Sequence, residues 1–110
     1  MKPPWLVPLL MAVPILLLVL CVPLLMGRVP PNAIYGFRTP KTMSKPEIWY
    51  PANRMAAIDM MVAAVLMLAA FAVGYRCITN ELMLLRFFAG AMLVCIFGAV
   101  AAAFLQLRKL

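Results

Sequence analysis

Residues able to bind a ligand specifically are concentrated in one stretch of this chain, between two long apolar runs. Residues 32–42 read Asn-Ala-Ile-Tyr-Gly-Phe-Arg-Thr-Pro-Lys-Thr, and residues 47–54 read Glu-Ile-Trp-Tyr-Pro-Ala-Asn-Arg. The guanidinium groups of Arg38 and Arg54 can each bind a planar oxyanion, such as a lipid phosphate or a peptide carboxylate, through two hydrogen bonds. These residue types therefore favour recognition of an anionic group.

Most of these side chains also have a structural interpretation that involves no ligand. Arg54 is better explained as an anchor at the membrane interface, whereas the position of Arg38 in the densest part of the stretch favours a binding role. Trp49 and Tyr50 are typical of the aromatic belt at the lipid head groups, with stacking on a ligand as the alternative. The remaining candidate binding residues are Asn32, Tyr35, Thr39 and Asn53.

Asp59 is the one charged residue in the second long apolar run, residues 55–73. A carboxylate inside a bilayer is costly, so it should be paired, protonated or facing a polar cavity. We expect the polar stretch to fold back over the helices so that Arg38 reaches Asp59. Such a pair could merely hold the loop in place or could take part in binding or coupling, and the sequence leaves both interpretations open.

Catalysis, metal binding and nucleic-acid binding find little support in the sequence. The chain has no His, and its three Cys residues lack the close spacing of a zinc site. No Ser or Cys is accompanied by a recognisable base, and Asp59 has no second acid at any readable spacing. We therefore expect no enzyme, no metal and no cofactor. Most of the basic residues behind the net charge of +7 lie at the ends of apolar runs, where they meet lipid head groups rather than nucleic acid.

Three apolar runs must position these residues. The chain is 67% hydrophobic and 12% charged, against roughly half and a quarter in soluble domains. Runs at about 6–26, 55–73 and 83–106 can each cross a hydrocarbon core about 30 Å thick. The first run is too long for a signal-peptide core and no small-x-small cleavage site follows it, so we expect it to stay in the mature protein. The predicted fold class is an all-α membrane protein, one membrane domain over residues 1–110 with three transmembrane helices.

A structured loop, residues 27–54, with a short helix is predicted between the first and second spans. Its length and its aromatic residues argue for a folded, functional segment rather than a disordered linker. Gly36 follows Tyr35 at a tight turn, where a glycine can adopt a positive φ.

The short helix should begin near Lys45. Ser44 and Glu47 have the spacing of a capping box, with Ser44 as the N-cap. Trp49 and Asn53, four residues apart, would then lie on one face of this helix.

Small residues predict where the helices approach one another closely. The pairs Ala70/Gly74 and Gly98/Ala102 have the four-residue spacing that lets helix backbones come together in a membrane. The short connection between the second and third spans predicts an antiparallel hairpin. The same small-residue faces could instead support a homodimer, and this alternative stays open.

Basic residues predict the orientation. One end of the predicted bundle carries Lys2, Arg76 and Arg86, and the other carries Arg28, Arg38, Lys41, Lys45, Arg54, Arg108 and Lys109. The second end should therefore face the cytoplasm, with the N-terminus outside and the C-terminus inside.

The loop also resembles a known family. A Pro-Asn pair, then Tyr-Gly-Phe-Arg-Thr, a Ser at a helix start, a Trp, and Asn-Arg before a transmembrane helix follow one another in this order. The residues concerned are Pro31, Asn32, Tyr35, Gly36, Phe37, Arg38, Thr39, Thr42, Ser44, Trp49, Asn53 and Arg54. This combination, over about residues 30–54, is similar to the SdpI/YfhL family of bacterial membrane proteins. The family's named member is an immunity protein that protects a cell from a secreted toxic peptide and also holds a transcriptional repressor at the membrane.

The resemblance implies a multi-pass protein of the bacterial inner membrane with a non-catalytic resistance, binding or signalling role. The lipid bilayer is one expected partner. The other is a toxic peptide, another membrane-active agent or a regulator protein. One alternative is an oligomeric transporter or channel component in which Asp59 responds to protons or cations. Another is a scaffold subunit of a larger membrane complex.

Overall fold

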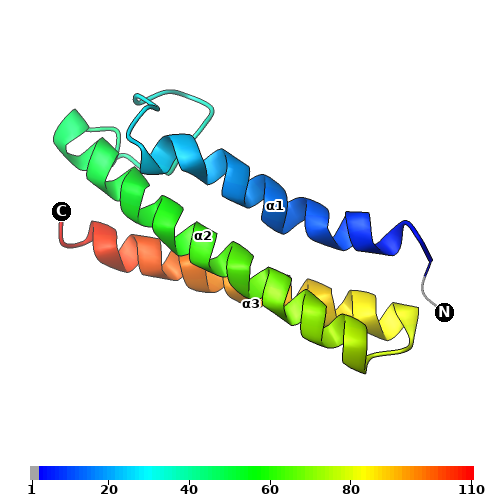
Figure 1. Ribbon diagram of the computed structural model, residues 1–110. Coiled ribbons are helices and arrows are strands. Elements are labelled where there is room, and N and C mark those ends of the chain that lie inside the picture. Colours follow the sequence, from blue (N-terminus) through cyan, green and yellow to red (C-terminus); the bar gives the residue numbers. More distant parts are fainter. Residues whose placement is uncertain (1–2) are drawn as a thin grey trace.

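Three long helices and one structured loop make up residues 3–110, the part of the chain described by the computed structural model (Figure 1). Helix α1 spans Leu6–Leu25, α2 spans Pro46–Cys77 and α3 spans Glu81–Leu107. Each helix is long and apolar enough to cross a membrane, since even the 20 residues of α1 extend about 30 Å. The described residues include no strand. The predicted all-α membrane architecture with three transmembrane helices is therefore confirmed.

The short helix expected before the second span forms the first part of α2 and is continuous with it. Pro46 occupies the first turn, where its missing N–H is harmless. The N-cap residue is Lys45, whose side chain makes no capping hydrogen bond. The Ser44 hydroxyl instead donates to the carbonyl oxygen of Lys41 at 2.6 Å. The predicted capping box was therefore wrong, because Ser44 closes the preceding turn rather than the helix end.

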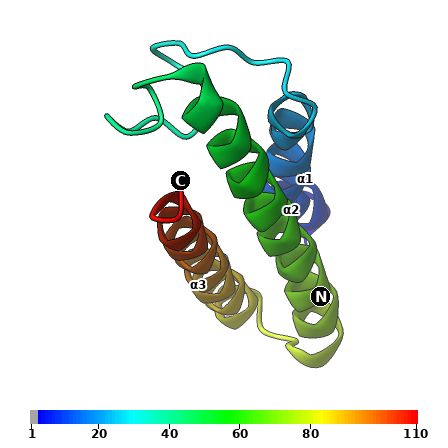
Figure 2. The same cartoon turned by 90° about the vertical axis from the view of Figure 1, so that its left-hand side faces the viewer.

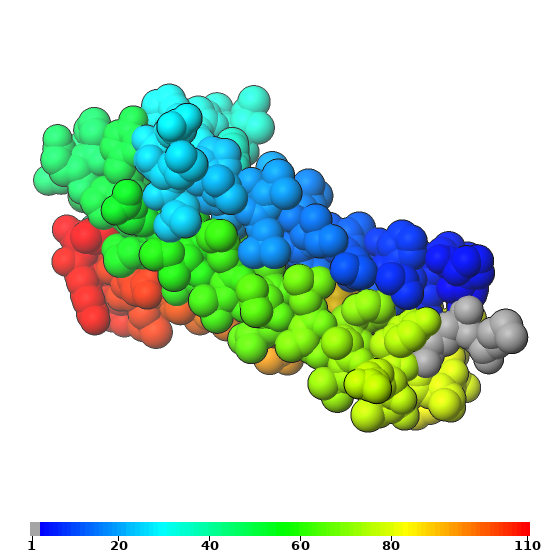
Figure 3. Space-filling view, in the orientation of Figure 1, coloured from blue at the N-terminus to red at the C-terminus, as the bar shows by residue number. Residues whose placement is uncertain are grey.

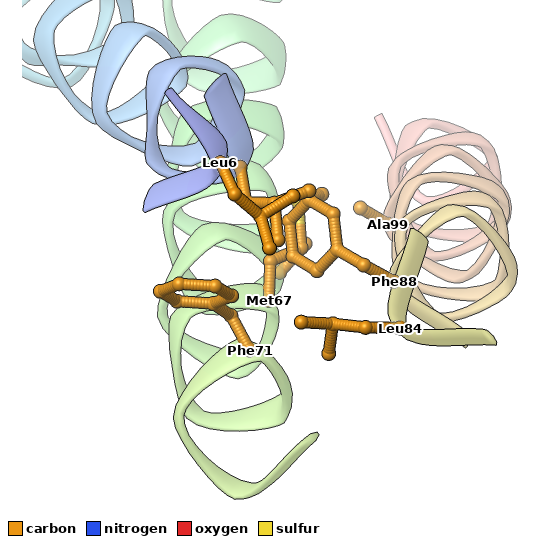
Figure 4. Packing of buried hydrophobic residues seen from close by; sticks show 8 residues of the cluster. Leu6, Met67, Phe71, Leu84, Phe88 and Ala99 are labelled. Atoms are coloured by element: carbon orange, nitrogen blue, oxygen red, sulfur yellow. The ribbon is translucent and has the colours of Figure 1, made fainter. Parts of the chain in front are cut away.

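The larger of two buried hydrophobic clusters among the described residues lies toward the end of the bundle where α2 turns into α3 (Figure 4). Its buried members are Leu6, Leu10, Ala63, Met67, Phe71, Leu84, Phe88 and Ala99, from all three helices. At Gly74 an added Cβ would lie 2.8 Å from the ring of Phe87, so only glycine allows α3 to come this close. The side chain of Asn80 caps α3 by accepting a hydrogen bond from the N–H of Met83 at 3.1 Å.

Helix α2 lies between the other two helices and packs against both, whereas α1 and α3 make at most marginal contact with each other (Figure 2). The bundle is elongated, with extents of 52 × 23 × 19 Å. In the space-filling view the loop lies over α1 and α2 at one end (Figure 3). Large apolar side chains such as Val94 and Phe97 are mostly exposed, as expected where the surrounding solvent is lipid.

Candidate functional site

The first turn of the loop is built around the side chain of Asn32. Its Oδ1 accepts hydrogen bonds from the N–H groups of Ile34 (2.9 Å) and Tyr35 (2.6 Å). Its Nδ2 donates to the carbonyl oxygens of Pro30 (2.8 Å) and Tyr35 (2.9 Å). Such local bonds let an Asn side chain substitute for a backbone turn. Asn32 therefore acts within the loop and does not face a ligand site.

Gly36, Trp49 and Asn53 hold the loop against α2. Gly36 has a φ of 118°, which confirms its predicted turn conformation. A Cβ at Gly36 would lie 2.8 Å from Oδ1 of Asn53 and 3.1 Å from the ring of Trp49. That same Oδ1 accepts the N–H of Phe37 at 2.6 Å, and the Asn53 Nδ2 donates to the carbonyl oxygens of Phe37 (3.3 Å) and Trp49 (2.9 Å). The predicted shared face of Trp49 and Asn53 is therefore the surface on which the loop is seated.

Trp49 does not belong to an aromatic belt, contrary to the favoured sequence interpretation. It is fully buried, with 0% of its surface exposed. Its indole Nε1 donates to the carbonyl oxygen of Val29 at 2.7 Å. A belt residue keeps one edge among the head groups, whereas here the folded loop covers the ring and supplies the partner for its N–H.

Two reciprocal hydrogen bonds between Thr39 and Thr42 form a second closed turn. The N–H of Thr39 donates to Oγ1 of Thr42 at 2.7 Å, and the N–H of Thr42 donates to Oγ1 of Thr39 at 3.1 Å. Thr42 is completely buried. The two hydroxyls thus replace the water that the backbone of this turn would otherwise need.

Two cationic side chains fasten the loop and α2 to the C-terminal ends of the other helices. The Nε of Arg54 donates to the carbonyl oxygen of Leu25 at the end of α1, at 3.2 Å. The Nζ of Lys41 donates to the carbonyl oxygen of Leu107 at the end of α3, at 2.8 Å. The last carbonyls of a helix lack intrahelical partners and carry partial negative charge, so cations stabilise them. Arg54, predicted as an interfacial anchor, thus bonds the end of α1 while its side chain stays exposed.

Beneath this loop lies a cavity of about 440 Å³. Its walls include Leu20 and Leu24 of α1, Ala56 and Met60 of α2, and Ala103 and Phe104 of α3, and residues 35–39 form the roof. The walls are almost wholly apolar, and the polar side chains Tyr35, Arg38, Thr39 and Asn53 are confined to the end nearest the loop. Because α1 and α3 scarcely touch each other, no element closes the side opposite α2.

Tyr35 and Arg38 differ in whether their polar groups already have a hydrogen-bond partner within the protein. The hydroxyl of Tyr35 donates to the carbonyl oxygen of Leu20 in α1. Desolvation by burial raises the pKa of Tyr35, and the nearby Cys21 thiol raises it further, so the hydroxyl keeps the proton that it donates. Arg38 is exposed at the roof, and within residues 3–110 its guanidinium has no hydrogen-bond or ion-pair partner. Arg38 is thus a cation at the cavity that is available to a ligand.

The expected pair between Arg38 and Asp59 is not formed. Asp59 lines a different groove, of about 340 Å³, between α2 and α3. Its Oδ1 accepts a long hydrogen bond of 3.5 Å from Nε2 of Gln106. Its Oδ2 and the Oε1 of Gln106 are buried without a partner. On α2, Ala56 and Met60 face the loop-roofed cavity while Asp59 lies on the neighbouring face, so a roof residue does not meet it.

The structure therefore divides the predicted binding residues into four groups. Tyr35, Arg38, Thr39 and Asn53 lie at the cavity; Asn32 and Trp49 hold the loop in place; Arg54 ties α2 to the end of α1; and Asp59 lies apart. Sequence reasoning missed the apolar walls of the cavity. The four-residue spacings of Ala56 with Met60 and of Ala99 with Ala103 were the available signals. It also missed Gln106, although an amide in an otherwise apolar helix is a signal of a polar contact.

Helices of this length and hydropathy, with a folded polar loop at one end, define a small multi-pass integral membrane protein. A family model described as the SdpI/YfhL protein family matches residues 28–105, which include the loop, α2 and most of α3. The match covers well over half of the chain, so the chain belongs to the SdpI/YfhL family and the resemblance drawn from the loop is confirmed. Neither the comparison with curated proteins nor that with solved structures gave a match.

Proposed function

We propose that this protein is a non-catalytic resistance protein of the bacterial inner membrane, which protects the cell by binding a membrane-active agent in the loop-roofed cavity. The cavity is the observation that carries this function. Its volume of about 440 Å³ lies in the range of small-molecule pockets, about 300–1,000 Å³. Apolar walls below a polar, cationic roof suit one segment of an amphipathic peptide or a lipid-like molecule. Membership of the SdpI/YfhL family supports an immunity role over other binding roles.

The open side of the cavity offers a route for the agent. A molecule already dissolved in the bilayer can enter between α1 and α3 without crossing the loop. The loop can therefore face the cytoplasm, as the basic residues predict, while the agent arrives from outside.

Protection should disappear when the cavity is filled. In Ala56→Phe a ring would project into the cavity, whereas Ala69→Phe adds the same ring at an exposed position of the same helix outside the cavity. A sensitive bacterium expressing each form is challenged with a panel of hydrophobic toxic peptides and charged single-chain surfactants. We expect wild type and Ala69→Phe to raise the inhibitory concentration of at least one agent several-fold, and Ala56→Phe to lose that gain. Equal protection by Ala56→Phe, with all three forms equally abundant, would contradict binding in the cavity.

A second candidate function is an oligomeric transporter or channel component. One observation favours it, namely the buried, unpartnered oxygens of Asp59 and Gln106 in the groove between α2 and α3, because such groups in membranes often lie on ion or proton pathways. Reconstituted vesicles with a pH-sensitive dye inside test this role. A proton or cation flux that Asp59→Asn abolishes would support transport, and an absence of flux would leave the resistance role standing.

A further inference from the structure

We propose that the loop-roofed cavity holds one acyl chain of an anionic phospholipid taken from the surrounding bilayer, with Arg38 binding the phosphate. This lipid would occupy the cavity before any toxic agent arrives, so its binding does not depend on the protective role.

The walls of the cavity fit a hydrocarbon chain better than a polar ligand. Leu20 and Leu24, Met60, and Val100 and Phe104 supply apolar surface from three different helices. Apart from the thiol of Cys21, a weak donor, the side chains of this part of the lining are apolar, so a bound molecule would find few hydrogen bonds to make there. With no element on the side opposite α2, a chain can slide in from the bilayer without leaving an apolar environment.

The roof fits a phosphate at the same time. Arg38 is the one basic residue that lines the cavity among residues 3–110, and its guanidinium is exposed and unpaired. Nearby cations are committed elsewhere, since Lys41 and Arg54 bind the ends of α3 and α1. A guanidinium can bind two phosphate oxygens at once. The apolar walls would contact the acyl chain and the single cation in the roof would contact the phosphate, which is how these two groups follow each other in a phospholipid.

The basic end of the molecule attracts anionic lipid, and the charge of Arg38 selects the head group at the cavity. The basic residues here are Arg28, Arg38, Lys41, Lys45, Arg54, Arg108 and Lys109, and Glu47 is the acidic residue beside them. Such an excess attracts anionic lipids to the membrane surface. At the cavity itself the nearest cation is Arg38, and the choline of a zwitterionic head group, or a cationic peptide, would bring a positive group next to it. We therefore expect phosphatidylglycerol to be preferred over phosphatidylcholine.

Native mass spectrometry of the full-length protein in detergent tests this preference. The protein is mixed with equal amounts of phosphatidylglycerol and phosphatidylcholine carrying identical acyl chains. We expect one retained phosphatidylglycerol per chain, favoured by roughly tenfold, because both phosphates can accept from Arg38 but the choline of phosphatidylcholine would place a second positive charge beside the guanidinium. Arg38→Gln should abolish the head-group preference but keep a lipid adduct. Arg108→Gln, which removes the same charge from the same end away from the cavity, should leave the preference unchanged.

The acyl chain is tested separately by fluorescence. In a Trp5→Phe background Trp49 is the remaining tryptophan. It is buried from bulk lipid and packs against Gly36, which lines the cavity. Phosphatidylglycerol with dibrominated acyl chains should quench Trp49, and the quenching should fall at least several-fold in Ala56→Phe but not in Ala69→Phe.

Two results would overturn the lipid assignment. One is a failure of the head-group test: wild type retains the two lipids equally, or Arg38→Gln and Arg108→Gln lose the preference for phosphatidylglycerol equally. Either outcome would mean that the lipid is adventitious and held at the surface. The other is an absence of specific quenching of Trp49. If Ala56→Phe does not fold, the lipid assignment is tested by the quenching of Trp49 in wild type and by the comparison of Arg38→Gln with Arg108→Gln. Loss of protection in Ala56→Phe together with a failed lipid test would leave the proposed function intact and remove only the lipid.

Discussion

At the scale of single residues, most polar and aromatic side chains of the loop motif serve to fold the loop itself. Asn53 is 2% exposed, and its amide makes three hydrogen bonds with the backbone of Phe37 and Trp49. A buried amide with satisfied partners fixes one arrangement of the chain, because any other arrangement leaves it unpaired. The loop motif therefore serves mainly to place Arg38 and Tyr35 at the cavity.

Gly36 should be the least replaceable residue of the loop. Gly36→Ala combines a positive φ of 118° with a Cβ 2.8 Å from the Asn53 side chain, and we expect a loss of roughly 2–4 kcal/mol. Gly27→Ala is the matched control, since Gly27 also has a positive φ but open space around the added Cβ, and it should cost about 1 kcal/mol. Thermal unfolding in detergent, followed by Trp49 fluorescence, measures both. Equal losses would mean that the close packing at Gly36 contributes nothing.

At the scale of elements, the two helix pairs are held in different ways. Helices α2 and α3 approach closely at Gly74, where the predicted small-residue contact occurs. The second predicted pair is different, because an added Cβ at Gly98 would meet no atom within 4 Å. Gly98 instead lines the groove that contains Asp59, so its small size is not needed for packing within one chain.

Alanine at these two glycines should have opposite effects. Gly74→Ala drives a methyl group into the ring of Phe87, and we expect a loss of about 1–3 kcal/mol. Gly98→Ala meets open space and improves helix propensity, so we expect a gain of up to about 1 kcal/mol. Unfolding in mixed micelles compares the two variants with wild type. A clear loss in Gly98→Ala would show that another molecule, such as a second copy of the chain, packs on this face.

At the scale of the whole molecule, the two ends of the bundle differ in how tightly they are packed and in how much positive charge they carry. The larger buried cluster lies toward the α2–α3 turn, while the cavity, most of the basic residues and a smaller cluster of Ile48, Ala52 and Leu107 lie at the loop end. A loose apolar cavity beneath a positively charged roof is suited to binding, and the packed end is suited to holding the helices together.

The orientation of the bundle can be measured by cysteine labelling. Lys45 and Lys109 are exposed at the loop end, and their side chains have no hydrogen-bond partner within residues 3–110. Each is replaced by Cys in a background where Cys21, Cys77 and Cys95 are Ala. We expect a membrane-impermeant maleimide to label both sites only after the cells are permeabilised, because the positive end should be cytoplasmic. Labelling in intact cells would place the loop outside.

The sequence by itself determined the membrane fold, because unbroken apolar runs of about 20 residues have the length and pattern of transmembrane helices, whose backbone groups pair within the segment. It also determined the turn at Gly36 and the shared face of Trp49 and Asn53, which depend on neighbours in the chain.

Only the tertiary structure decided which polar side chains meet. Trp49 is buried because the loop folds over it, and Asp59 faces Gln106, 47 residues away, rather than Arg38. Such pairings depend on the rotation of each helix about its axis, which is set by contacts such as that of Gly74 with Phe87. The cavity is likewise a property of the packing, since it exists only because α1 and α3 both rest on α2 and leave a space between them.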